Sequence, residues 1–241
     1  MAASSEIKRK RVLVLGEIKA GKSKFVAQAM LHSGCSGAAV AGPAEWQRSK
    51  GLRACHVNYF NRGNLCLFDT EGWIGPPPLD QVRLLCGGVT TGTAPLWSSD
   101  LVSAQDNKAD LVVVVVNGVS LARRKRGWFG EYGELANDVV SGIEELFEVI
   151  KNVTQRAPVL LITHQDYFER SRSLIWNAKY SAELWRTIYD RLSRQWQSNV
   201  FAVGTTCTPS TCSNPDKCDC EYAGEAVDQI ASLLYTAFEI V

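Results

Sequence analysis

Short apolar runs alternate with amphipathic stretches along the 241 residues of the chain. Runs rich in β-branched residues predict strands at 11–15, 111–116, 159–162 and 200–203. The stretches between and after them predict helices. This alternation is typical of a mostly parallel sheet covered by helices on both faces, so we expect an α/β fold.

Four amphipathic stretches predict helices, because their apolar residues recur every three or four positions. The first is expected to end at Gly34, which is placed as a helix C-cap. The apolar stripes consist of Phe25, Val26, Ala29 and Met30 in the first, Leu135, Val139, Ile143, Leu146 and Ile150 in the second, Leu184, Ile188 and Leu192 in the third, and Val227, Ile230, Leu233, Leu234 and Ala237 in the last. The run 111–116 is almost pure valine and predicts a central strand buried on both faces.

A turn-rich tetrapeptide, 61–64, separates the apolar runs 55–60 and 65–68. It predicts an antiparallel hairpin, so one strand of the sheet is expected to be reversed. Long irregular stretches, which in compact domains are usually functional, remain at 35–53, 70–109 and 205–222. Since there is no repeat or clear linker, we expect one domain over 11–241 after a flexible basic segment, 1–10.

Composition and charge narrow the class of protein. With 46% hydrophobic and 21% charged residues, the chain has the composition of a globular protein. It carries 26 Lys and Arg against 25 Asp and Glu, a formal net charge of +1. Such a balance provides no broad positive field for nucleic acid or an anionic membrane. We therefore expect no nucleic-acid partner.

The apolar runs are short. The longest, 111–116, is far below the roughly 20 residues of a membrane-spanning helix. The run 12–15 behind the basic N-terminus is too short for a signal peptide. The eight cysteines are then expected to be mostly free thiols in a reducing compartment. We expect a cytoplasmic protein without a transmembrane segment.

The strongest motif is a phosphate-binding loop. Residues 16–23, GEIKAGKS, match G-x-x-x-x-G-K-S/T in full, between a predicted strand and a predicted helix. This spacing lets backbone N–H groups surround phosphate oxygens while the helix N-terminus adds partial positive charge. Lys22 is expected to contact the β- and γ-phosphates, and the Ser23 hydroxyl to coordinate Mg²⁺. The alternative is a chance match in a glycine-rich turn.

A carboxylate for the Mg²⁺ site is expected at the end of a neighbouring strand. The run 65–68 leads directly into Asp69. Residues 69–72, DTEG, also match the pattern D-x-x-G, in which the N–H of Gly72 would contact the γ-phosphate. We therefore assign Ser23 and Asp69 as metal ligands, and Lys22 and Gly72 as catalytic residues.

A motif for recognising the base follows the strand 159–162. Thr163, His164 and Asp166 form T-H-x-D, a variant of N/T-K-x-D. A carboxylate accepts hydrogen bonds from guanine N1–H and the N2 amine, and adenine has no such pair. Asp166 is therefore expected to select guanine, with His164 stacking on the purine in place of the usual Lys. The alternative for Asp166 is a helix N-cap.

Thr205 lies in the turn after the last predicted strand, from which backbone N–H groups could donate to guanine O6. The cofactors expected are GTP or GDP and Mg²⁺. The residues expected to bind the nucleotide are Gly16, Lys19, Ala20, Gly21, Lys22, Ser23, Lys24, Thr163, His164, Asp166 and Thr205.

With these motifs the chain resembles the Ras-like G-domain superfamily of P-loop GTPases over essentially its whole length. Within it, T-H-x-D is similar to the motif of the immunity-associated GTPases and the interferon-induced protein 44 family, and residues 79–88, LDQVRLLCGG, resemble the latter's segment after D-x-x-G. The resemblance implies a three-layer fold with a mostly parallel six-stranded sheet, one antiparallel strand and helices on both faces. It also implies Mg²⁺-dependent GTP binding, and switch loops that contact a protein effector or a second copy of the chain.

The chain departs from this superfamily at two points. No Thr occurs between Ser23 and Thr70 to complete the Mg²⁺ coordination from switch I, where Ser36 or Ser49 would have to substitute. Trp73 follows D-x-x-G at the place of the Gln that usually orients the attacking water. An indole cannot take up a proton from that water, so hydrolysis is expected to be slow.

We therefore predict a GTP-binding protein that acts as a nucleotide-dependent switch with slow intrinsic GTP hydrolysis. Two alternatives stay open. The chain could be an interaction module that binds a nucleotide without hydrolysing it, or an ATP-dependent P-loop enzyme such as a kinase, in which Asp166 only caps a helix.

Two further features each have two interpretations. A loop with four cysteines could hold Zn²⁺ or carry free or redox-active thiols, and its spacing lacks the paired C-x₂-C turns of ordinary zinc sites. The basic tetrapeptides 8–11 and 123–126 could contact anionic lipid as a peripheral membrane contact, or could simply be solvated. The four cysteines are Cys207, Cys212, Cys218 and Cys220.

Overall fold

A computed structural model provides the coordinates of the chain. The residues that it describes are 10–32, 53–59, 63–87, 109–124, 132–164, 186–187, 190–192, 194 and 200–202. The predicted helix over 227–237, the turn residues 61 and 62 and the C-cap Gly34 lie outside them.

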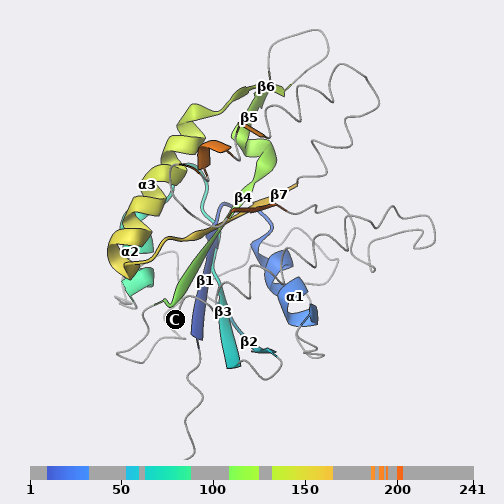
Figure 1. Ribbon diagram of the computed structural model, residues 1–241, viewed down its shortest axis with the longest axis vertical. Helices are drawn as coiled ribbons and strands as arrows, with labels where there is room; N and C mark the ends of the chain where they lie inside the picture. Colours follow the sequence, from blue (N-terminus) through green and yellow to red (C-terminus); the bar gives the residue numbers. More distant parts are fainter. Residues whose placement is uncertain are drawn as a thin grey trace, which may run out of the picture.

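A six-stranded sheet forms the centre of the molecule, in the order β2-β3-β1-β4-β7-β8 (Figure 1). Strand β2 runs antiparallel to β3, and the other neighbours pair in parallel. The α/β class predicted from the sequence is confirmed. Strand β1 begins one residue before the predicted run, because Lys10 already pairs with Leu65. The strands are β1 (Lys10–Gly16), β2 (Arg53–Tyr59), β3 (Gly63–Asp69), β4 (Leu111–Asn117), β7 (Val159–Thr163) and β8 (Val200–Ala202).

Helices lie on both faces of this sheet. Helix α1 (Lys22–His32) covers one face, and helices α2 (Leu79–Gly87) and α3 (Asn137–Thr154) lie together on the other (Figure 1). The described part of the chain is therefore layered as helix, sheet and helix.

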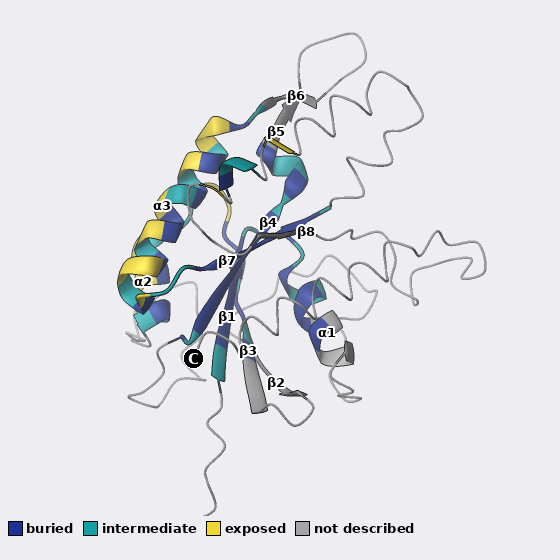
Figure 2. Cartoon of the chain, viewed as in Figure 1, coloured by how far each residue is buried: buried dark blue, intermediate teal, exposed yellow. Residues whose placement is uncertain are grey.

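The core lies between β4 and α3. Residues 111–116 of β4 are all buried, as predicted for a central strand. Helix α3 turns a buried stripe towards the sheet and an exposed one outwards (Figure 2). The stripe has the spacing of three and four residues that predicted this helix, and it consists of Val140, Ile143, Leu146, Phe147, Ile150 and Thr154. Leu135, assigned to the same helix from the sequence, ends strand β6 instead.

Four short elements were not predicted from the sequence: helix α2, strands β5 and β6, and a 3₁₀ helix, η2 (Gly118–Leu121). Helix α2 buries just Val82 and Cys86, so its apolar stripe is too brief to stand out in the stretch 70–109. Strands β5 (Ala122–Arg124) and β6 (Tyr132–Leu135) form a small separate sheet. They have three and four residues, which is too few for an alternating pattern to be recognised.

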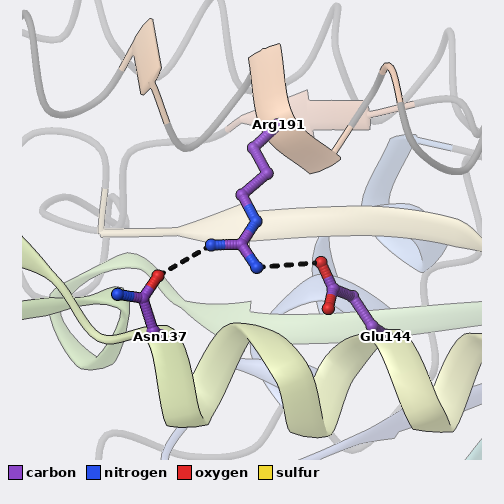
Figure 3. A network of polar contacts seen from close by, with 3 residues as sticks. All are labelled: Asn137, Glu144 and Arg191. Atoms are coloured by element: carbon purple, nitrogen blue, oxygen red, sulfur yellow. Dashed lines mark hydrogen bonds and ion pairs between the residues drawn. The ribbon is translucent and has the colours of Figure 1, made fainter.

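The helical residues 190–192 pack on α3. Leu192 is fully buried in the core, as the apolar stripe predicted. Beside it, the Arg191 guanidinium donates to Asn137 Oδ1 at 2.7 Å and to Glu144 Oε1 at 3.3 Å (Figure 3). Through these two hydrogen bonds, Arg191 joins residues 190–192 to the first two turns of α3.

Among the described residues, no helix combines the length and the apolar character that crossing a membrane requires.

Candidate phosphate-binding site

The predicted strand, loop and helix are present at residues 10–32. Strand β1 ends at Gly16 and helix α1 begins at Lys22. Gly16 has a φ of 153°, and a Cβ at this position would overlap the carbonyl oxygen of Val115 in β4. The loop therefore starts pressed against β4, an approach that only glycine permits. The first turn of α1 carries no acidic residue, so the partial positive charge of its N-terminus is not neutralised there.

The Lys22 side chain folds back over this loop and contacts its first two residues. Its side chain is only 6% exposed, and Nζ donates to the carbonyl oxygens of Gly16, at 3.0 Å, and Glu17, at 2.7 Å. Burial lowers the pKa of this lysine to about 8, while the nearby charges of Asp69 and Glu17 raise it. At pH 7 the ammonium is still protonated, and it provides a positive charge with little surrounding water.

Ser23 and Asp69 lie next to each other, as predicted for metal ligands. The Ser23 hydroxyl donates to Asp69 Oδ2 at 2.7 Å. They meet because β3 pairs with β1, with Asp69 opposite Val14. A hydroxyl and a carboxylate are hard oxygen donors of the type that Mg²⁺ prefers. Within the described residues no three His, Cys, Asp or Glu side chains gather around a point. This donor set fits Mg²⁺, which usually keeps several waters and takes further oxygens from phosphate.

The D-x-x-G segment is bound to the loop. Gly72 lies so close that a Cβ on it would be 2.6 Å from the N of Ile18 and 2.7 Å from Lys22 Nζ. The Ile18 N–H donates to the Trp73 carbonyl at 2.9 Å, and Glu17 and Trp73 form a parallel β-bridge. The structure thus brings Lys22 and Gly72, the two residues predicted to act in catalysis, next to each other.

The Trp73 side chain faces the core and not the loop. It is 7% exposed and belongs to the same apolar cluster as Val114 and Ile143. The sequence predicted only that this residue replaces the usual Gln and cannot take up a proton from the attacking water. The structure shows a role that was not predicted: Trp73 is a core residue whose backbone is hydrogen-bonded to the phosphate loop.

Thr163 connects the end of β7 with the loop. Its hydroxyl lies 2.8 Å from the carbonyl oxygen of Ala20 and 3.2 Å from that of Val116. A hydroxyl has one hydrogen, so it donates to one of these acceptors at a time. His164 follows with a positive φ of 62°, and its Nδ1 is 2.9 Å from the same hydroxyl. Thr163 of T-H-x-D therefore contacts the phosphate loop, and His164 contacts Thr163.

The remaining predicted residues divide into two groups. Lys19 lies within the loop, with a positive φ of 63°, and Lys24 lies in the first turn of α1. The residues of the second group lie outside the described part of the chain, so the structure does not test them: Asp166, Thr205, Ser36, Ser49, Cys207, Cys212, Cys218 and Cys220.

Two residues of the site were missed from the sequence. Thr70 is fully buried and donates its hydroxyl to the Val14 carbonyl at 2.7 Å, which attaches the start of the D-x-x-G segment to β1. Glu17 is half-buried beside Lys22; burial raises the pKa of its carboxyl, and the charge of Lys22 lowers it. Both occupy variable positions of their motifs, so the pattern carries no signal for them.

The comparisons with known proteins give structural matches at low sequence identity. Neither a protein-family model nor a curated protein matches the chain. Among solved structures it is similar to Era in complex with MgGDPNP and a segment of 16S ribosomal RNA, at 14% identity and a TM-score of 0.47. It is equally similar to a variant of Era from Aquifex aeolicus bound to GDP·AlF₄⁻, again at 14% identity and a TM-score of 0.47. These matches cover 98% and 97% of this chain but 57% of each Era chain, so the chain spans little more than half the length of Era.

Proposed function

We propose that the chain is a G-domain protein that binds GTP and GDP with Mg²⁺. It would act as a nucleotide-dependent switch, whose segment at Gly72 contacts the γ-phosphate in the GTP form only. The observation that carries the proposal is the hydrogen bond of 2.7 Å between Ser23, in the first turn of α1, and Asp69, at the end of β3, next to the buried Lys22. A charged lysine, a hydroxyl and a carboxylate at the mouth of one loop match what a magnesium–phosphate complex needs.

Each residue has a role in this proposal. The Lys22 ammonium would bind phosphate oxygens, together with backbone N–H groups of the loop from Gly16 to Ser23. Ser23 and Asp69 would hold Mg²⁺, which when bound neutralises charge on the phosphates. Gly72 is in contact with the loop and would donate its N–H to the γ-phosphate, so that the segment after it responds to the presence of that group.

The choice of guanine is proposed from the T-H-x-D motif. Thr163 anchors the end of β7 on Ala20, which supports a site for the base next to the phosphate loop. His164 would stack on the purine, Asp166 would accept from guanine N1–H and N2, and Thr205 would lie near O6. The narrower kinship, with the interferon-induced protein 44 family and the immunity-associated GTPases, also rests on this motif and on residues 79–88.

Hydrolysis is proposed to be slow. The Trp73 side chain is in the core, and an indole has no acceptor that could take up a proton from water. The same observation favours the second candidate function, an interaction module that binds a nucleotide without turning it over. Release of phosphate under single-turnover conditions separates the two: none over several hours favours the interaction module.

The expected partners are a protein effector or a second copy of the chain, in contact with the switch loops. Peripheral membrane contact through the basic tetrapeptides, a cytoplasmic location and the absence of a nucleic-acid partner are also proposals, the last resting on the net charge of +1. Era has been solved with ribosomal RNA. A mobility-shift assay with an RNA of that kind tests the expected absence directly.

The test of the proposed function is a binding screen of the purified chain with GTP, GDP and ATP, with and without Mg²⁺. We expect guanine nucleotides to bind more tightly than ATP, and Mg²⁺ to strengthen GTP binding. Asp166→Asn should shift the preference towards xanthosine triphosphate, whereas the control Asp190→Asn, on an exposed helical turn, should not. Equal binding of ATP and GTP, or no shift in Asp166→Asn, would contradict guanine recognition and favour an ATP-dependent enzyme.

A further inference from the structure

A pocket lies between β4, α3 and the segment after Gly72, and Glu17 of the phosphate loop also lines it. Its volume is about 370 Å³, within the range of roughly 300–1,000 Å³ that is typical of small-ligand sites. The proposed nucleotide function assigns no ligand to this pocket, although Glu17 of the phosphate loop and the segment after Gly72 line it.

The walls of this pocket are apolar. Trp73 and Pro77 line it on the side of the connecting segment, and Val114 and Ile143 line it on the sides of β4 and α3. The position of Gly142 on α3 leaves room there, since a Cβ on it would meet only the Pro77 Cδ, at 3.7 Å. Removing an apolar group from water into such a space is favourable.

Two acidic residues complete the lining. Glu17 comes from the phosphate loop and is half-buried, and Asp138 comes from the first turn of α3 at the exposed rim. Among the residues that line this pocket there is no Lys, Arg or His. A ligand inside therefore meets apolar surface and two carboxylates, and one of these, Glu17, also lies in the field of the Lys22 charge.

We propose that this pocket binds a small organic ammonium ion, a ligand with an apolar body and one positive charge. The apolar walls account for the body, and the carboxylates of Glu17 and Asp138 for the charge. A neutral ligand of the same shape would lose the charge pairing, and an anionic one would be repelled. The proposal does not depend on nucleotide binding.

The probe is 4-phenylbutylamine, compared with 4-phenylbutanol and 4-phenylbutyrate, on the full chain without nucleotide by ligand-observed NMR and titration. We expect the amine to bind with a Kd on the order of 1 mM, as suits a fragment of this size. The alcohol should bind about fivefold more weakly, the scale of a partly exposed ion pair, and the butyrate should not bind.

Variants test the location. Gly142→Leu should fill the pocket and abolish binding, and the control Ser141→Leu, at the adjacent exposed position of α3, should leave it unchanged. Gly142→Ala, which fills less space, should weaken binding several-fold and serves if the larger variant does not fold. Asp138→Asn, at the rim, and Glu17→Gln should each reduce the difference between amine and alcohol.

Three results would overturn the proposal. They are no binding of the amine to the full chain, equal binding of amine and alcohol, and amine binding that survives both substitutions of Gly142.

Discussion

Lys22 is the residue in which burial and charge oppose each other most directly. Its pKa of about 8 in the free protein results mainly from loss of water around the ammonium. Phosphate oxygens near Nζ would stabilise the charged form, so the pKa should be higher in a nucleotide complex. Binding above pH 8 then requires uptake of a proton, and binding below pH 8 does not.

We therefore expect the affinity for GDP to be nearly constant from pH 7 to pH 8 and to fall above that, approaching tenfold per pH unit. The measurement is titration calorimetry at several pH values in buffers of different ionisation enthalpy. Lys22→Met should bind more weakly with a flat profile. A wild-type profile that stays flat to pH 10 would show that Lys22 does not contact the phosphates.

Gly72 provides a second test at the residue scale. A methyl group there would meet the backbone of Ile18 and the ammonium of Lys22, so Gly72→Ala should lower the free energy of unfolding by about 1–3 kcal/mol and weaken nucleotide binding. Gly142→Ala is the matched control, since it lies within a helix with room for a methyl group and should stabilise by about 0.5–1 kcal/mol. Chemical denaturation measures both. Equal effects of the two substitutions would contradict the close contact at Gly72.

The sequence was sufficient to identify the residues that belong to a motif with fixed spacing. Lys22, Ser23 and Asp69 lie together as predicted, because the motif implies a strand, loop and helix and the strand order brings the third residue alongside. Thr70 and Glu17 could not be predicted, since the role of Thr70 depends on which carbonyl faces its hydroxyl, and that of Glu17 on its burial beside Lys22.

At the scale of elements, length decided what could be predicted. Helix α3 has 18 residues and a repeated buried stripe, so its pattern is clear from the sequence. Helix α2 has nine residues and buries only two of them, and β5 and β6 have three and four residues, so each offers little periodic signal. These short elements are stabilised by tertiary contacts with longer neighbours. A local sequence pattern contains no information on such contacts.

Arg191 is expected to attach one element to another. Arg191→Met keeps the apolar stem but leaves Asn137 and the largely buried Glu144 without this donor, so it should lower the free energy of unfolding by about 1–2 kcal/mol. Arg194→Met, which removes an exposed pair with Asp190, should change it by less than about 0.5 kcal/mol. Urea denaturation of the two variants distinguishes them, and equal values would show that the Arg191 contact does not stabilise the helix on α3.

For the molecule as a whole, Trp73 and Ile74 make a clear contrast between neighbours. Trp73 is 7% exposed and packs in the core, whereas Ile74 is 78% exposed. Trp73→Ala should destabilise by about 3–5 kcal/mol, and Ile74→Ala should change stability by less than about 0.5 kcal/mol. Thermal unfolding compares them. A mild effect of Trp73→Ala would mean that its side chain is not part of the core.

Cys86 reports on opening of the whole fold. It is fully buried in α2, and burial raises the pKa of its thiol to about 12, so almost no thiolate is present at pH 8. We expect iodoacetamide to leave Cys86 unmodified in the native protein and to label it at the rate of unfolding, as peptide mass spectrometry would show. Rapid labelling in native buffer, at the rate of an exposed cysteine, would contradict this packing of α2 on the core.

The contacts of the phosphate loop also determine when the loop can form. Its first residue lies against Val115, its serine is bonded to Asp69, and its Ala20 accepts from Thr163, which is 143 positions further along the chain. Contacts between such distant residues close late in folding. A ribosome that has released only the first hundred residues therefore displays the complete GEIKAGKS sequence without its supporting neighbours. The phosphate loop should therefore become able to bind a ligand in a single step, after β7 has been synthesised and has paired with β4.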